Sequence, residues 1–493
     1  MVYLQKFCNY NDHQDHHHMI RNVDQGFQSM MIMKEDLRLI KRVKSKLFSL
    51  LCLCFLSCSF IWVSQIFGFP FSVSYILQAE NVSCKNSGSP IASSVSNGTL
   101  YCDRTHVRTD ICYMKGDIRT QSSSSLIFLY NPTTNQDHQE ETIKPYTRKW
   151  EHNVMNRIDE LHLISKPKPL SKFDHKCEVF HDVPGVFFST GGYTGNVYHE
   201  FNDGIIPLYI TTQHYNKQVI FVILEYHSWW HTKYAQILAQ LSNYPPINFD
   251  SNSKTHCFKE AIVGLKIHDE LTIDSSLMER GSSKAKSIVG FQELLTRAYT
   301  PNNERVTSRH KLRPKGPKMV LLSRGGTRSI TNEHALVKLG HKLGFDVQIL
   351  KPNRKTELGT IYKAISTSDV MVGVHGAAMT HFLFLEPKRV LIQVIPLGTE
   401  WASETYYGEP AKKMGLKYIG YKIHPRESSL YSKYDKDDLV LRDPNSVNNK
   451  GWEYTKKVYL DDQKVTLDLK RFKKLLVHVY EDYLEQFEDL NKH

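Results

Sequence analysis

The chain has 493 residues, of which 41% are hydrophobic and 23% charged, and its formal net charge is +12. This length allows two or three domains with a large core, and the composition is typical of a globular protein. The positive charge comes without clustered arginine and aromatic residues or finger spacing, so nucleic-acid binding is not favoured.

The N-terminal region predicts a single membrane anchor. Residues 1–46 form a polar tail that becomes basic from Lys34 onward, and residues 47–69 are about as long as a bilayer-spanning helix. Because the basic residues precede the apolar run, we expect a cytosolic N-terminus and a translocated remainder. A cleaved signal peptide is the competing interpretation. It is disfavoured because the run starts late and no A-x-A site follows.

The predicted luminal side begins with a stem, residues 70–100. It carries two glycosylation sequons, at Asn81 and Asn97. Five cysteines follow the span, and an oxidising compartment permits disulfides there. Connectivity cannot be deduced from an odd number of cysteines alone. The preferred pairs are Cys102–Cys112 and Cys177–Cys257, which leave Cys84 in the stem free.

Residues 101–310 predict a first α/β domain with a parallel sheet, because strand and helix patterns alternate over most of it. The expected elements are a hairpin around Cys102–Arg119, strands at Leu126–Tyr130, Gly185–Ser189, Gln218–Leu224 and Ala261–Leu265, a glycine-rich loop and helix at Gly191–Tyr215, and a helix at Trp229–Leu241.

Residues 311–467 predict a second α/β domain after a basic, proline-broken linker. Its expected strands are Met319–Ser323, Asp346–Leu350, Val370–Val374 and Val390–Ile395, and its expected helices are Asn332–Leu343 and Thr356–Ser366. An amphipathic helix, Asp468–Asn491, closes the chain.

The stretch Ser366–Pro387 is the first candidate site. A buried strand ends at His375, and Gly373 and Gly376 allow a ligand to approach the backbone before the next helix begins. In an open α/β sheet, ligands bind beyond the carboxyl ends of strands, with anions at helix N-termini. The alternative is a tightly packed junction with a structural histidine.

A second candidate is the loop Ser323–Arg328, which follows another strand and places two arginines around two glycines. Guanidinium groups suit phosphate oxygens. A solvated basic loop is the alternative. If both strands belong to one sheet, this loop and His375 lie at the same edge, and a diphosphate is the simplest shared ligand.

In the first domain, His199, Glu200 and Asp203 lie at a helix start after the glycine-rich loop. His199 and Asp203 are spaced i, i+4 and share a face. The imidazole or a carboxylate of this group, His199, Glu200 or Asp203, could take a proton from an acceptor hydroxyl. On spacing alone, however, acidic residues favoured by the helix dipole and a structural histidine explain the pattern slightly better.

The sequence predicts no obligatory divalent metal. Its only D-x-D, Asp435-Lys436-Asp437, lies in a charged run that is expected to be exposed. Arginines and helix ends would instead neutralise a leaving diphosphate.

Four stretches of the sequence together resemble glycosyltransferase family 61, most closely its plant members that add pentosyl branches to xylan in the Golgi. They are GGYTGNVYHEFNDGIIPLYIT, LLSRGGTRSITNE, VGVHGAAMTHFLFLEP and GEPAKKMGLKYIGY, and they stand behind the predicted anchor. The resemblance covers about residues 101–490.

The resemblance implies a GT-B architecture, in which two Rossmann-like domains face each other across a cleft and the C-terminal helix 468–493 crosses back to the first domain. It implies an inverting transfer from a UDP-sugar. The residues that would line the nucleotide-sugar site are Ser323, Arg324, Arg328, Gly373, His375, Gly376, Ala377 and Thr380. The residues expected on the acceptor side are Tyr193, Asn196, His199, Glu200 and Asp203.

The sequence thus predicts a type II Golgi membrane enzyme that moves xylose or arabinofuranose from a UDP-sugar to xylan. Asp203 or His199 is expected to be the base, and His375 either acts in the chemistry or holds the diphosphate. N-glycan xylosyl transfer and protein O-GlcNAc-type transfer are alternatives within the same family. A non-catalytic anchored scaffold of a glycan-synthesis complex is the alternative from another class. The protein itself could form a homo- or hetero-oligomer.

Overall fold

The computed structural model describes residues 96–131, 139–167, 176–278, 287–300 and 316–491, with side chains to 485. Within them, no helix is both long and apolar enough to cross a bilayer. The predicted tail, span and Asn81, and most of the stem, lie outside the described residues. Asn97 is exposed in a turn before the first strand. Residues 437–461 group separately from residues 88–436 and 462–493.

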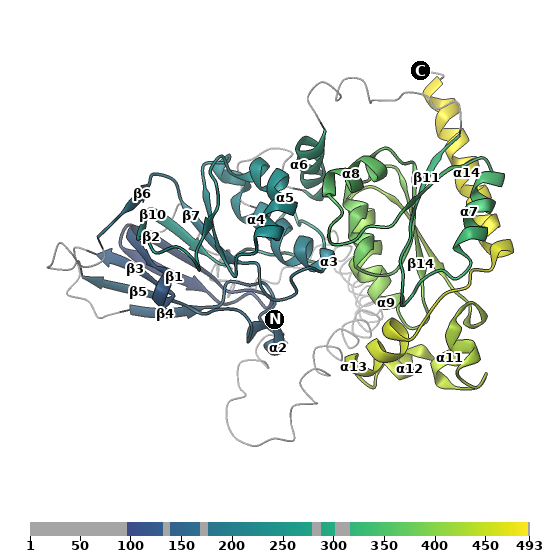
Figure 1. The fold of residues 1–493 in the computed structure, drawn as a ribbon, viewed down its shortest axis with the longest axis horizontal. Coiled ribbons are helices and arrows are strands. Elements are labelled where there is room, and N and C mark those ends of the chain that lie inside the picture. Colours follow the sequence, from purple (N-terminus) through teal and green to yellow (C-terminus); the bar gives the residue numbers. More distant parts are fainter. Residues whose placement is uncertain (1–95, 132–138, 168–175, 279–286, 301–315, 492–493) are drawn as a thin grey trace, which may run out of the picture. The chain divides into compact units, whose positions relative to one another are not determined.

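The first region is built on a ten-stranded mixed sheet (Figure 1). Its path runs β4-β5-β3-β2-β10-β7-β8-β9, with β1 on β2 and β6 on β10. The strands are β1 (Thr99–Asp103), β2 (Ile111–Gln121), β3 (Leu126–Asn131), β4 (Gln139–Ile143), β5 (Leu161–Pro167), β6 (Val179–His181), β7 (Gly185–Ser189), β8 (Ile220–Leu224), β9 (Ile247–Asn248) and β10 (His256–Val263).

Only part of this sheet is parallel. β10, β7, β8 and β9 pair in parallel, as the alternating pattern predicts, and β7 and β8 are buried along their whole length. The β1–β2 hairpin adds to β10 in antiparallel fashion. β4 and β5 were not predicted, because their polar and half-exposed residues lack the apolar run of a strand covered on both faces.

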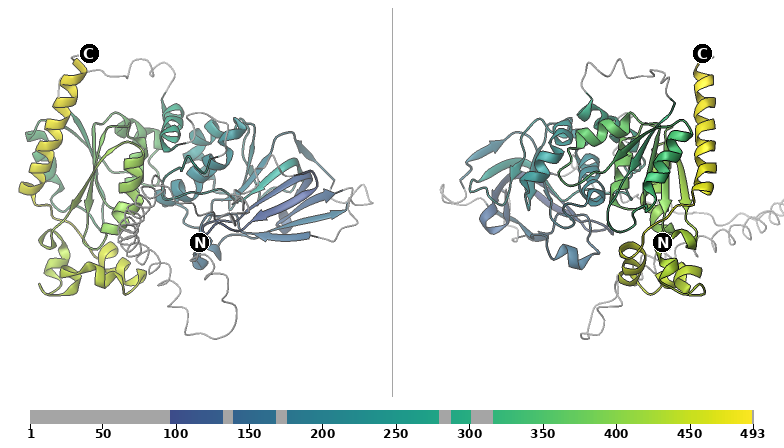
Figure 2. Two further views of the ribbon diagram at one scale, coloured as in Figure 1. Left: turned by 180° about the vertical axis from the view of Figure 1, so that it is seen from behind. Right: turned by 45° about the vertical axis from the view of Figure 1, so that its right-hand side comes forward.

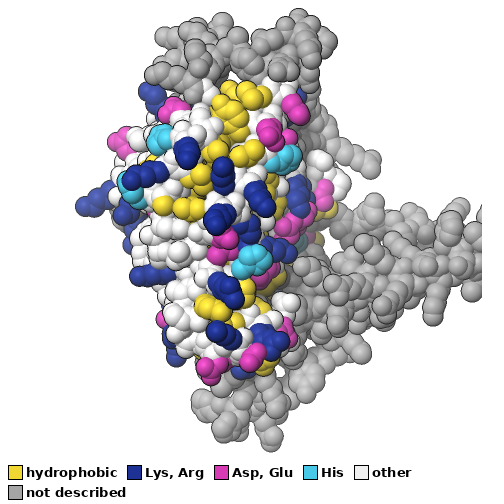
Figure 3. All heavy atoms as spheres, turned by 90° about the vertical axis from the view of Figure 1, so that its right-hand side faces the viewer, with side chains coloured by type: hydrophobic (Ala, Val, Ile, Leu, Met, Phe, Trp, Pro, Cys, Tyr) yellow, Lys and Arg dark blue, Asp and Glu magenta, His cyan; other side chains and the backbone are white. Residues whose placement is uncertain are grey.

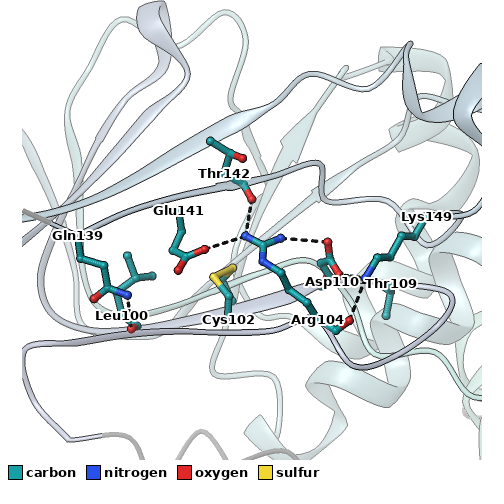
Figure 4. Close-up of a disulfide and its surroundings, with 10 residues drawn as sticks. Leu100, Cys102, Arg104, Thr109, Asp110, Gln139, Glu141, Thr142 and Lys149 are labelled. Atoms are coloured by element: carbon teal, nitrogen blue, oxygen red, sulfur yellow. Dashed lines mark hydrogen bonds and ion pairs between the residues drawn. A yellow bond between two sulfur atoms is a disulfide. The ribbon is translucent and has the colours of Figure 1, made fainter. Parts of the chain in front are cut away.

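Two disulfides join the preferred cysteine pairs. Cys102 and Cys112 face each other directly across β1 and β2, and Cys177 bonds to Cys257 on β10. Beside the first bond, Arg104 donates to Glu141 and to the Thr142 carbonyl and pairs with Asp110 (Figure 4). These contacts link the hairpin to β4.

Helices accompany this sheet. They are α2 (His152–Met155), α3 (Val197–His199), α4 (Ile206–Thr212), α5 (Ser228–Leu241) and α6 (Ile288–Tyr299), and a π-helical segment, Glu200–Ile205, joins α3 to α4. The apolar stripe of Gly191–Tyr215 is buried here: Phe201, Ile205 and Leu208 belong to one hydrophobic core with residues of α5 and α6.

The second region is a five-stranded, wholly parallel sheet of order β12-β11-β13-β14-β15 (Figures 1 and 2). The strands are β11 (Lys318–Leu322), β12 (Asp346–Leu350), β13 (Val370–Val374), β14 (Val390–Ile395) and β15 (Lys417–Lys422). The helices are α7 (Glu333–Lys342), α8 (Leu358–Ser366), α9 (Glu400–Ser403) and α10 (Glu409–Lys413), with a π-helical segment, Glu404–Gly408, between the last two. The molecule is therefore of mixed α/β class.

The segment after His375 differs from the prediction. It is a 3-10 helix, Ala377–Phe384, whose residues from Met379 onward are buried. The junction between β13 and this 3-10 helix is tight, and Gly373 permits it. A β-carbon at position 373 would lie 2.6 Å from the Met379 sulfur.

The closing helix α14 (Leu469–Asn491) packs on the second region. Phe472 contacts the Tyr421 ring at 4.9 Å, Tyr480 contacts Phe345 at 5.3 Å, and Asp482 pairs with Lys417. These contacts join α14 to the second sheet and not to the first region, to which it was expected to return. Figure 3 shows the face that lies on the right-hand side in Figure 1. On this face, basic side chains are interspersed with acidic and apolar ones.

The unit of residues 437–461 consists of α11 (Leu439–Arg442), α12 (Pro444–Asn448), α13 (Trp452–Thr455) and a π-helical segment that starts at Lys456. At its start, the exposed Asp437 pairs with Arg442 at 2.7 Å, as suits a surface carboxylate.

Candidate functional site

The first cluster lies at the turn from β7 into α3. Asn196 caps α3, because its side chain accepts a hydrogen bond from the Tyr198 amide. His199 ends α3, and the wider π-helical turn carries Glu200 and Asp203. Asn196 thus has a structural task, and the two acidic residues and His199 come together as predicted.

Asp203 is a fully buried carboxylate among donors. Its Oδ2 lies 2.7 Å from both Arg148 Nε and His199 Nδ1, and Asn202 donates to Oδ1 at 2.8 Å. Burial raises the pKa of Asp203, but the Arg148 charge and the His199 hydrogen bond outweigh it and lower the pKa to about 2. Asp203 therefore stays ionised at neutral pH.

The hydrogen bond with Asp203 determines which nitrogen of the His199 imidazole carries a proton. A carboxylate only accepts hydrogen bonds, so Nδ1 must carry a proton, and in the neutral imidazole the lone pair is on Nε2. Tyr193 stacks on the imidazole with centroids 4.1 Å apart, and its hydroxyl donates to Glu151 at 2.7 Å. The ring is thus held on two sides, with Nε2 as a proton acceptor.

Glu200 occupies the same pocket. It accepts hydrogen bonds from the Gly195 amide at 2.6 Å and from the Trp230 indole. Burial raises the pKa of Glu200 to about 7 against these two hydrogen bonds. The pocket is lined by both residues together with Tyr146, Tyr193, Thr194 and Trp230, among others. It is a concave, partly aromatic site with two groups able to exchange protons.

The second cluster forms at the carboxyl edge of the parallel sheet, as predicted from the strand order. β11 and β13 are adjacent, so the loop after Leu322 and the turn after Val374 meet. Arg324 donates from Nη1 to the His375 carbonyl at 3.3 Å. A β-carbon on Gly376 would lie 2.3 Å from Arg324 Nη1 and 3.7 Å from Arg328 Nη1. Glycine is therefore needed for the close approach of the Arg324 guanidinium, whereas the distance to Arg328 is an ordinary contact.

Arg324 suits an anionic ligand. It forms no ion pair with any residue in the described part of the chain, and its buried Nε has no hydrogen-bond partner there. Burial lowers the pKa of Arg324. A desolvated cation of this kind gains more from a phosphate than one in bulk water.

The other residues predicted at this site differ in their burial and in the residues that they contact. The Ser323 hydroxyl donates to Glu333 at 3.0 Å, Thr380 is buried beside Tyr407, and Ala377 is half-buried. Gly373 is required by packing against Met379. Arg324, Arg328, His375 and Gly376 form the charged centre of the cluster.

A hydrogen-bond relay that the sequence did not reveal orients His375. Tyr418 donates to Gln393 Oε1 at 2.9 Å, which turns the amide nitrogen toward the imidazole, 3.0 Å from Nδ1. His375 Nδ1 therefore accepts, and Nε2 carries the proton. Burial, with the charges of Arg328 and Arg324, lowers the pKa of His375 to about 3. His375 is a neutral hydrogen-bond donor.

Tyr407 connects the two clusters. Its ring lies 5.5 Å from the His375 centroid and 6.0 Å from that of Tyr198, the neighbour of His199. Arg148, Gln393 and Tyr407 were all missed from sequence. The one local signal was a glutamine inside the apolar strand VLIQVI.

The comparisons with known proteins identify the family of the chain. Residues 127–392 match the family model Glycosyltransferase 61. The chain is 54% identical over 459 residues to the xylan glycosyltransferase MUCI21 of Arabidopsis thaliana. The aligned stretch covers 89% of this chain and 92% of that protein.

Two rice proteins (Oryza sativa subsp. japonica) are also similar. The α-1,3-arabinosyltransferase XAT3 is 35% identical over 382 residues, 77% of this chain and 65% of its own length. The β-1,2-xylosyltransferase XYXT1 is 32% identical over 397 residues, 77% of this chain and 83% of its own. The chain belongs to the glycosyltransferase 61 family and is a glycosyltransferase.

Proposed function

We propose that this protein moves a pentose, xylose or arabinofuranose, from a UDP-sugar to the xylan backbone as a side-chain substitution, with inversion. The observation that carries this proposal is the 54% identity to a xylan glycosyltransferase over 89% of the chain. The two rice relatives bear the names of an arabinosyl- and a xylosyltransferase, so both pentoses are candidate donors.

The donor diphosphate binds beside Arg324 and Arg328, and His375 donates a hydrogen bond from Nε2 to its departing oxygen. The Arg324 guanidinium, which forms no ion pair with the described residues, and the orientation of His375 by Gln393 support this role. Because these groups are oriented before the donor arrives, they stabilise the developing charge without reorganisation. We expect these arginines, and not an obligatory divalent metal, to neutralise the leaving diphosphate.

The acceptor hydroxyl enters the pocket that His199 and Glu200 line. His199 Nε2 takes the hydroxyl proton while the acceptor oxygen bonds to the anomeric carbon, and the bond from that carbon to the diphosphate oxygen breaks. UDP leaves with the electron pair. Asp203, with its low pKa, stabilises the imidazolium that forms. Attack opposite to the leaving group inverts the anomeric configuration.

The proposed architecture is GT-B, with the parallel second sheet as the nucleotide-sugar domain and the first region as the acceptor domain. The proposed location is the Golgi membrane, through one N-terminal helix with the catalytic region luminal. The basic residues before the apolar run, the two sequons and the two disulfides support an oxidising luminal compartment.

The test offers the detergent-solubilised full chain a panel of UDP-sugars with xylohexaose, and determines linkage and anomeric configuration of the product. Pentosyl transfer to xylohexaose with inversion is expected. Transfer only to glycopeptides or N-glycans would reassign the acceptor, and failure to bind UDP by folded protein would favour a scaffold.

A further inference from the structure

Trp150 is an exposed aromatic residue between β4 and α2. Its exposed fraction is 42%, although tryptophan is the largest apolar side chain. No aromatic ring of the described residues stacks on it. Two buried arginines approach the indole instead: the Cζ atoms of Arg108 and Arg148 each lie 5.3 Å from the ring centre. Cation–π contacts of this kind hold the indole in one orientation and leave apolar area open to a ligand.

Arg148 places Trp150 next to the acceptor pocket. The same guanidinium carbon lies 5.6 Å from the ring centre of Tyr193, which lines the pocket, and its Nε binds Asp203 at 2.7 Å. Trp150 and Tyr193 are therefore neighbours across one side chain. A polymer that places one hydroxyl in the pocket would have its neighbouring units near the indole.

The charges around Trp150 select a neutral ligand. Arg148 pairs with Asp203 and Glu151, and Arg108 pairs with Glu270 at 3.2 Å. Two guanidiniums thus face three carboxylates, so the described ion pairs around the indole do not favour an anion. A flat indole beside this ion-paired cluster suits the apolar C–H face of an uncharged sugar ring.

We propose that Trp150 is a stacking platform for a backbone unit of the xylan acceptor, outside the pocket where transfer occurs. This inference rests on the proposed function, because it assumes the same acceptor. It adds a binding subsite that extends recognition beyond the sugar that receives the pentose.

The test compares Trp150→Ala, Trp150→Phe and a control, Phe180→Ala, in the full-length protein. Phe180 on β6 is a matched control, because it is 56% exposed and lies 5.3 Å from a cation, Lys259. Binding of xylobiose, xylotetraose and xylohexaose is measured by titration calorimetry, and UDP binding is measured in parallel. KM and kcat follow with the active donor.

A platform predicts that Trp150→Ala weakens xylohexaose binding roughly tenfold, as loss of a stacking ring does, with a smaller loss for shorter acceptors. Trp150→Phe retains binding within about threefold, and Phe180→Ala and UDP binding are unchanged. Equal xylohexaose affinity in Trp150→Ala and wild type overturns the platform.

Two further outcomes also count against it. If Trp150→Ala lowers only kcat, and equally for all acceptor lengths, Trp150 is not a stacking platform. It would then act by positioning Arg148. Wild-type protein that binds UDP but no xylo-oligosaccharide overturns the proposed acceptor, and the subsite with it.

Discussion

His199 and Asp203 lie four residues apart, and the imidazole Nδ1 is 2.7 Å from the carboxylate Oδ2. The carboxylate is fully buried and is bound at the same distance by Arg148. Between the two candidate bases, this relationship supports the roles proposed above, in which Asp203 orients the imidazole and His199 accepts the proton. Tyr193, stacked on the imidazole, restricts it further.

His199→Gln is expected to lower kcat by roughly 10²–10⁴-fold, because the proton acceptor is lost while donor binding is untouched. UDP affinity should stay within about twofold of wild type. The assay is UDP release with xylohexaose, and His227→Gln, a histidine before α5, is the control. Near-normal turnover in His199→Gln would remove His199 as base and turn attention to Glu200.

Arg324→Ala is expected to weaken UDP binding roughly 10–100-fold, since a charge-assisted hydrogen bond contributes about 1.5–3 kcal/mol. Arg324→Lys should recover only part of it, because an ammonium lacks the planar fork. Calorimetry with UDP measures both. The control is the exposed Arg426→Ala; unchanged UDP affinity in Arg324→Ala would refute the phosphate role.

Gln393→Glu is expected to introduce a pH dependence into UDP binding. A carboxylate beside Nδ1 would raise the pKa of His375, so the ring would become cationic at mildly acidic pH. UDP affinity should then rise as pH falls from about 7 to 5, relative to wild type. Tyr418→Phe keeps Gln393 but removes its anchor, and serves as the comparison. Parallel pH profiles in wild type and Gln393→Glu would contradict the relay.

The lowered pKa of His375 also predicts how the folding stability of the protein depends on pH. Its pKa is about 3 when folded, below the ordinary value of 6.5, so between these values the unfolded chain binds a proton that the folded chain excludes. Stability contributed by the neutral ring is therefore present above about pH 6.5 and is lost as pH falls toward 3.

His375→Gln should accordingly show a smaller loss of stability between pH 7 and 5 than wild type, measured by urea unfolding at each pH. The exposed His478→Gln on α14 is the control and should keep the wild-type slope. An unchanged slope in His375→Gln would show that the histidine titrates alike in both states.

The two disulfides should contribute unequally to stability. Cys177 and Cys257 are 80 residues apart in sequence, and Cys102 and Cys112 are 10 apart. In the loop-entropy model, removing the longer closure costs about 1.5–2 kcal/mol more. Paired serine variants, unfolded in urea under non-reducing conditions, measure the difference. A greater loss from the short loop would indicate that strand pairing, and not chain entropy, dominates.

Much of the fold was predictable because its signals are local. Gly185–Ser189, Val370–Val374 and Val390–Ile395 are strands at the predicted bounds, since largely apolar runs specify strands buried on both faces. Asp346–Leu350 is also a strand at the predicted bounds, although most of its residues are exposed or half-buried. β4 and β5 escaped prediction because they are half-exposed and polar. The helix predicted after His375 became a 3-10 helix, since the junction is packed too tightly around Met379.

By itself, the sequence determined the strands, the glycine turns and the i, i+4 spacing of His199 and Asp203, all of which depend on neighbours within a few residues. Only the tertiary structure decided that Arg148, 55 residues earlier, meets Asp203, and that Gln393 lies beside His375. Such partners are set by strand register, which places Gln393 opposite Gly373. An alternating hydrophobic pattern helps to set strand register, but β13 and β14 are apolar and buried along their whole length and carry no such alternation. Their register was therefore decided only when the distant segments packed together.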